Sequence, residues 1–107
     1  MIMHTLVYRF TEPAPEVQRQ AFFAEAGRVA LGTGLAESFA AQPGLPGPMG
    51  DGAQVAIAQL TFRDAEHLRA YAAAPAVRQL LARWRQRLHW EIVPITHEPL
   101  HPAAAEE

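Results

Sequence analysis

Strand-forming residues dominate residues 2–10, and their side chains divide between two faces with the two-residue period of a β-strand. Apolar side chains occur on both faces. We therefore expect helices to cover one face of this strand and a different layer to cover the other. One of the two faces carries Ile2, His4, Leu6, Tyr8 and Phe10.

A helix is predicted from about residue 16 to residue 30. Prolines precede this segment and glycines follow it, which is typical of the first turn and of the end of a helix. Phe22 and Phe23 lie in the middle of the segment, and adjacent residues of a helix point about 100° apart. One phenylalanine can therefore pack on the sheet while its neighbour faces the open end of the fold.

Two further strands are predicted at residues 35–42 and 53–62, the first of them weakened by alanine and glutamate. Between them, residues 43–52 contain prolines and glycines at a density that excludes a helix or a central strand. We therefore expect a loop between these two strands.

A second helix is predicted after Asp64, whose side chain is expected to cap the helix N-terminus. Pro75 interrupts this helix, and the part that follows carries a single apolar stripe. A fourth strand is predicted at residues 89–96, where Pro94 indicates an edge strand or a bulge.

The order of these elements is β-α-β-β-α-β, which is the split βαβ pattern of the ferredoxin-like α+β fold. Residues 1–98 are expected to form this single domain, and residues 99–107 a flexible C-terminal tail. Helices on one face of an open sheet leave the other face bare. We therefore predict a homodimer in which a second copy covers that face to form a dimeric α/β barrel, with Trp90 near the interface.

The composition excludes several classes of function. A net charge of -2 argues against nucleic-acid binding, and the arginines between residues 78 and 87 are expected to form a solvated helix face. The absence of cysteine excludes disulfides and thiolate nucleophiles and suits a cytoplasmic location, while the absence of lysine excludes Schiff-base catalysis. We expect no leader peptide and no membrane span. The histidines lack the spacing of metal ligands, so no metal and no other cofactor is predicted.

Three stretches of the sequence resemble the stress-responsive dimeric α/β-barrel family, often called Dabb. They are the strand that begins at His4, the Thr61–Asp64 segment and the Tyr71–Ala76 segment. The last of these looks like the Tyr-x-x-His-Pro-x-His segment of the family. The resemblance extends over residues 2–97 and implies the same barrel fold.

The family includes stress-induced proteins and a plant cyclase that folds a linear polyketide without a cofactor, using a tyrosine and a histidine. By this resemblance, Tyr71 matches the tyrosine, and the Phe22–Phe23 pair is similar to the first helix of that cyclase. The two histidine positions of the motif are occupied here by Ala74 and Val77. The remaining candidate for the base is His4, since an imidazole titrates near neutral pH.

The candidate site therefore combines catalytic and substrate-binding side chains around a small apolar or aromatic molecule. His4 and Tyr71 are the candidate catalytic residues, although a histidine bonded within the sheet and a core tyrosine are the plainer interpretations. The candidate substrate-binding residues are Leu6, Tyr8, Phe22, Phe23 and Trp84, which could equally be plain core.

Three functions are compatible with this site. The first is a cofactor-free cyclase or isomerase that acts on an apolar or polyketide-like substrate by acid–base chemistry. The second is a cofactor-independent monooxygenase of aromatic polyketides. Some related dimeric barrels with this activity rely on asparagine and tryptophan, so the absence of asparagine from this chain disfavours it. The third is a stress-associated protein that binds a ligand without turnover.

Overall fold

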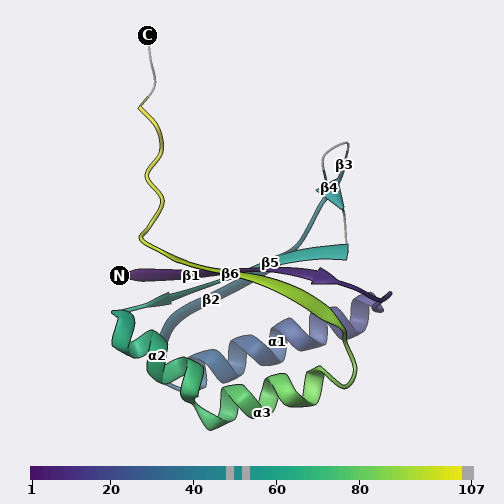
Figure 1. Ribbon diagram of the computed structural model, residues 1–107, viewed down its shortest axis with the longest axis horizontal. Coiled ribbons are helices and arrows are strands. Elements are labelled where there is room, and N and C mark those ends of the chain that lie inside the picture. Colours follow the sequence, from purple (N-terminus) through teal and green to yellow (C-terminus); the bar gives the residue numbers. More distant parts are fainter. Residues whose placement is uncertain (48–49, 52–53, 105–107) are drawn as a thin grey trace.

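The four longest strands form one antiparallel sheet, and three helices cover one of its faces (Figure 1). The structure is a computed structural model that describes residues 1–47, 50–51 and 54–104. The strands are β1 (Ile2–Phe10), β2 (Ala36–Pro43), β5 (Val55–Phe62) and β6 (Trp90–His97), and the helices are α1 (Glu16–Gly32), α2 (Ala65–Ala73) and α3 (Pro75–Trp84). The strand order is β2-β5-β1-β6. The predicted α+β, ferredoxin-like fold is confirmed.

The stretch between β2 and β5 contains two very short strands, β3 (Pro46–Gly47) and β4 (Gly50–Asp51). They pair with each other and, within the described residues, with neither edge of the main sheet. The predicted loop at residues 43–52 is therefore only partly right: Pro43 ends β2 in the main sheet, and β3 and β4 form a short ladder of their own. Residues 48–49 and 52–53 lie outside the described residues, as do 105–107 of the expected tail.

Local signals set the ends of several elements as the sequence predicts. The Asp64 side chain accepts a hydrogen bond from the backbone N–H of His67 at 2.9 Å and so caps α2. Pro75 separates α2 from α3, because proline lacks the amide hydrogen that a continuous helix needs. Gly34 follows α1 with a φ of 72°, a conformation that favours glycine. Pro94 lies in β6, which is an edge strand.

The main core lies between the sheet and the helices and is centred on Phe22, which is fully buried. The centre of its ring lies 5.0 Å from that of Trp90, 5.6 Å from that of Trp84 and 5.8 Å from that of Tyr8. The expectation that Trp90 lies near an interface between copies is wrong, since this side chain is only 6% exposed in a single copy. Trp90 pairs with Phe10 in the β1–β6 register, and both side chains belong to the face that the helices cover.

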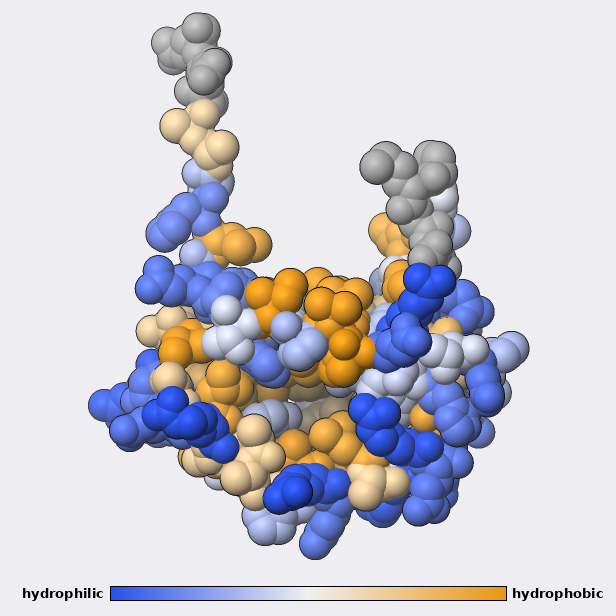
Figure 2. Space-filling view, viewed as in Figure 1, coloured by the Kyte–Doolittle hydropathy of each residue, from blue (hydrophilic) through white to orange (hydrophobic). Residues whose placement is uncertain are grey.

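The opposite face of the sheet is open in the single chain. Four aliphatic side chains on it are between 37% and 57% exposed: Val7, Ile57, Val93 and Ile95. β3, β4 and the C-terminal segment after β6 all project on this side, away from the helices (Figure 1). Figure 2 shows hydrophobic side chains gathered on the surface between these two projections. The described residues therefore do not supply the predicted second layer on this face of β1.

Candidate functional site

His4 lies on the face of β1 that also carries Leu6 and Tyr8. Its Nδ1 atom is 3.1 Å from the hydroxyl oxygen of Thr96 on β6, the residue opposite it in the register. Partial burial lowers the pKa of His4, and the nearby charge of His97 lowers it further. The imidazole is therefore neutral at neutral pH, which is the state that a general base requires.

Tyr71 lies on α2 with its ring against that of Phe62, at a distance of 5.1 Å between ring centres. Burial raises the pKa of the Tyr71 hydroxyl, so this group stays protonated and can donate a hydrogen bond. The pKa of Tyr8 is also raised, chiefly by burial and also by the charge that Tyr71 would carry. Within the described residues, the structure records no hydrogen bond between His4 and Tyr71.

The five candidate substrate-binding residues occupy different environments. Phe22, Tyr8 and Trp84 are buried in the main core, and Leu6 packs against this core as a partly buried residue. Phe23 is also partly buried, and its ring meets the edge of the Tyr8 ring at 5.2 Å between centres. Of the five, only Phe23 borders the main cavity of the described structure.

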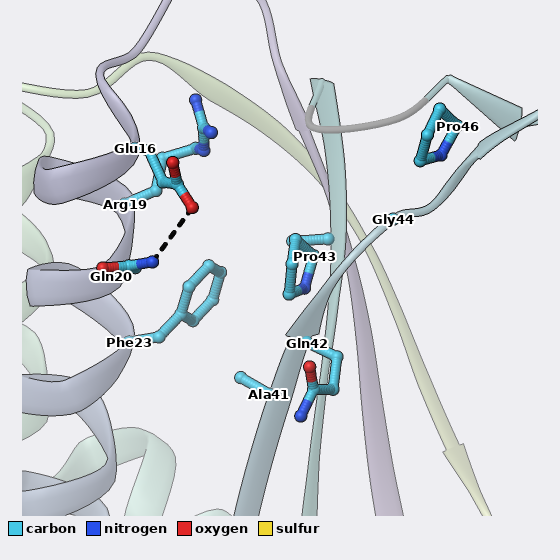
Figure 3. Close-up of a pocket in the computed structure, with 10 residues that line it drawn as sticks. Glu16, Arg19, Gln20, Phe23, Ala41, Gln42, Pro43, Gly44 and Pro46 are labelled. Carbon is cyan, nitrogen blue, oxygen red and sulfur yellow. Dashed lines mark hydrogen bonds between the residues drawn. The ribbon is translucent and has the colours of Figure 1, made fainter.

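This cavity has a volume of about 570 Å³ and lies between α1 and the strands β2 and β5 (Figure 3). Such a volume lies in the range of pockets that bind small molecules, roughly 300–1,000 Å³. The apolar part of its wall is formed by Phe23, Ala41, Pro43, Gly44, Pro46 and Ala56. The cavity therefore offers one aromatic ring and a largely aliphatic floor.

Polar side chains from the first turns of α1 line one side of the cavity. The Glu16 carboxylate accepts a hydrogen bond from the Gln20 side chain at 3.1 Å (Figure 3). Arg19 donates a hydrogen bond to the backbone carbonyl of Ala14, and its guanidinium lies 6.0 Å from the centre of the Phe10 ring. The cavity thus has an apolar interior with hydrogen-bonding groups at one side, the usual composition of a small-molecule site.

The sequence interpretation included Phe23 but missed the other residues of this cavity. The α1 residues that line it are Glu16, Arg19, Gln20 and Phe23. Their spacing of three, four and seven residues puts them on one helix face, and this spacing was the available signal. The opposite wall comes from the end of β2, from Gly44 and Pro46 after it and from Ala56 of β5, and no local pattern relates these residues to α1.

The arginines between residues 78 and 87 are exposed, as predicted, but several of them contact the aromatic core. The guanidinium of Arg85 lies 4.5 Å from the centre of the Trp90 ring, and that of Arg87 lies 5.5 Å from the centre of the Trp84 ring. Arg83 forms an ion pair with Glu25 at 2.5 Å. Arg85 and Arg87 thus lie over the rings of two buried tryptophans, and the charge of Arg83 is paired with a carboxylate.

Two other kinds of site receive no support from the described residues. Among them, no group of three or more histidine, aspartate or glutamate side chains is placed to hold a metal ion. No helix in the described part of the chain has the length and apolar character needed to cross a membrane.

The sequence matches no protein-family model and no curated protein sequence. The structure, in contrast, resembles many solved structures at low sequence identity. The crystal structure of the Arabidopsis thaliana protein At3g17210 has a TM-score of 0.80 and 14% identity, over 97% of this chain and 100% of that one. A dabb family protein with a ferredoxin-like fold from Mesorhizobium loti has a TM-score of 0.73 and 18% identity, over 94% and 97% of the two chains.

Two other similar structures are those of a dimeric protein and of an oxygenase. A dimeric ferredoxin-like protein from Thermobifida fusca has a TM-score of 0.71 and 17% identity, over 90% of this chain and 88% of that one. SnoaB from Streptomyces nogalater, a cofactor-independent oxygenase, has a TM-score of 0.66 and 18% identity, over 94% and 98% of the two chains. At these identities the likeness establishes the ferredoxin-like fold.

Proposed function

We propose that this chain is a stress-responsive dimeric α/β-barrel protein that binds a small apolar or aromatic molecule in the cavity beside α1. The observation that carries the proposal is the cavity itself, which combines a volume of about 570 Å³ with an apolar interior and polar groups on one side. The sequence resemblance and the ferredoxin-like fold support the family. A cytoplasmic location, suited to a chain without cysteine, is part of the same proposal.

We propose that the protein forms a homodimer in which a second copy covers the open face of the sheet. Val93 and Ile95 are 57% and 47% exposed on this face, and an apolar surface of this kind is stabilised when a partner removes it from water. A two-fold arrangement presents the same face from both copies. The likeness to a dimeric ferredoxin-like protein supports this assembly.

A catalytic role for His4 and Tyr71 is a second candidate function. A neutral imidazole could remove a proton from the carbon next to a carbonyl, and the Tyr71 hydroxyl could donate a hydrogen bond to the resulting enolate oxygen. The directions of their pKa shifts favour these two roles. Neither residue borders the main cavity, however, so the geometry favours ligand binding over this cyclase or isomerase chemistry. The proposed acid–base reaction of His4 and Tyr71 requires no metal and no organic cofactor.

The monooxygenase alternative is weaker. Its support is the shared fold with SnoaB, which is described as a cofactor-independent oxygenase. The chain contains tryptophan but no asparagine, so a polar group other than an amide of asparagine would have to assist such a reaction.

Ligand binding can be tested with the neutral fluorescent probe N-phenyl-1-naphthylamine, whose emission rises in apolar sites. Ala41 lines the cavity, and Ala41→Phe should fill part of it and abolish most of the probe signal. Ala24→Phe is the matched control, because Ala24 lies on the exposed side of α1. Equal probe binding by both variants and the unmodified protein would contradict the assignment of the cavity. Native mass spectrometry of freshly purified protein would then identify any retained ligand and show whether it survives unchanged.

A further inference from the structure

The segment formed by residues 44–47 and 50–51, here called the arm, is joined to the rest of the fold by few bonds. The backbone N–H of Gly44 donates to the carbonyl of Val55 at 2.8 Å, where β2 ends. Beyond that bond, Pro46 pairs with Asp51 and Gly47 with Gly50, and the described residues of the arm form no ladder with the main sheet. A pair of two-residue strands rich in glycine and proline has little stability on its own. The position of the arm therefore depends on what packs against it.

The same arm belongs to two surfaces. On the side of α1, Gly44 and Pro46 form part of the cavity wall, next to Pro43 (Figure 3). On the other side of the sheet, the arm projects beside the open apolar face (Figure 1). Leu45 within it is 80% exposed, so it presents most of its apolar surface to water in the single chain. Any partner on the open face would thus lie next to a wall of the cavity.

The open face and its two flanking projections best fit a second copy of this chain. The C-terminal segment projects on the flank opposite the arm and also carries an exposed leucine, Leu100, at 81% (Figures 1 and 2). On the sheet between them, Arg9 lies opposite Glu91 in the register, so a positive and a negative charge balance each other on the open face. The same face of a second copy can therefore approach it without net charge repulsion. The likeness to a dimeric ferredoxin-like protein points to the same occupant.

We propose that a second copy holds the arm in place and thereby completes the cavity wall, so that dimerisation and ligand binding are coupled. Packing of Leu45 against the partner removes it from water and restricts the arm to the position that closes the cavity. By thermodynamic reciprocity, a ligand in the cavity must then strengthen the dimer by the same factor by which the dimer strengthens ligand binding. This inference rests on the proposed function, since the coupled ligand is the one bound beside α1.

The test measures the affinity for N-phenyl-1-naphthylamine over a dilution series of the protein, with the fraction of dimer followed by analytical ultracentrifugation. The fluorescence that is present with the unmodified protein and lost in Ala41→Phe is assigned to probe bound in the cavity. We expect cavity binding to be about tenfold weaker in the monomer than in the dimer, which is within the usual range of coupling between sites. Each dimer holds two cavities, so we also expect saturating probe to lower the dimer dissociation constant by the square of this factor, about a hundredfold.

Two substitutions separate the arm from the rest of the interface. Val93→Glu, on the open face and remote from the cavity, should produce a folded monomer with the weak affinity of the diluted protein. Leu45→Ser should weaken both dimerisation and probe binding, whereas the matched control Leu31→Ser, on the helical side of the molecule, should change neither. Circular dichroism checks that each variant is folded, and the dilution series of the unmodified protein decides the question if Val93→Glu does not fold.

Equal cavity affinity in monomer and dimer would overturn the coupling and leave the proposed ligand site intact. A protein that stays monomeric at the highest concentration would also overturn it. Absence of probe binding in every state of the unmodified protein would instead refute the proposed function on which the inference rests.

Discussion

Phe22 and Phe23 are neighbours in α1 but occupy different environments, so their replacement by alanine should have different costs. Phe22 is fully buried, and four aromatic rings lie with their centres 5.0 to 5.8 Å from its own. Phe→Ala in such a position removes the buried side chain and leaves a cavity, which together cost about 3–5 kcal/mol. We expect about 4 kcal/mol for Phe22→Ala, a large fraction of the roughly 5–15 kcal/mol that stabilise a domain.

Phe23 borders an existing cavity and is only partly buried. Its removal enlarges a space that is already open, so the cavity contribution is small. What is lost is part of the roughly 1.5–3 kcal/mol of a fully buried side chain, together with the edge contact to Tyr8. We therefore expect Phe23→Ala to lower the free energy of unfolding by about 1.5 kcal/mol and to weaken binding of N-phenyl-1-naphthylamine. The control is Phe22→Leu, which should largely preserve binding of the probe.

Urea unfolding followed by circular dichroism measures both costs, at one fixed protein concentration because the proposed dimer makes stability depend on concentration. With a slope of about 2 kcal/mol per molar urea, the midpoint should fall by about 2 M for Phe22→Ala and by less than about 1 M for Phe23→Ala. Equal losses for the two variants would refute the assignment of Phe22 to the core and Phe23 to the cavity.

Two further predictions concern titratable groups. Hydrogen bonds from His67 lower the pKa of Asp64 in the folded state, so this carboxylate stabilises the fold above its unfolded pKa, and the stabilisation is lost as the pH falls through the folded value. Asp64→Ala should therefore lower the urea midpoint at pH 7 and have a smaller effect at pH 2; an equal effect at both pH values would contradict the charged cap. Burial raises the pKa of Tyr8 and Tyr71 above the usual value near 10, so an ultraviolet titration should detect less than half of the tyrosine ionised in the folded protein at pH 10. Half-ionisation at that pH would contradict the burial of both hydroxyls.

Local sequence determined the elements of this protein and several of their boundaries. Pro75 divides the second helical region, and Asp64 caps it, because each acts on backbone groups within a few residues. Pro94 predicted an edge strand or a bulge, since a strand paired on both sides needs the amide hydrogen that proline lacks, and β6 is an edge strand. The element order then favoured the ferredoxin-like fold, as such connections allow few arrangements.

The tertiary structure alone decided which side chains meet. Trp90 turned out to be core, because the side of a strand residue depends on its register with β1, and a shift of one residue would reverse it. The sequence did not predict the cavity either, since its walls come from α1, from β2 and the residues just after it, and from β5, which are separated along the chain. No local pattern encodes a space between distant segments. The distribution of apolar residues thus determined the layers, while packing determined where those layers leave room for a ligand.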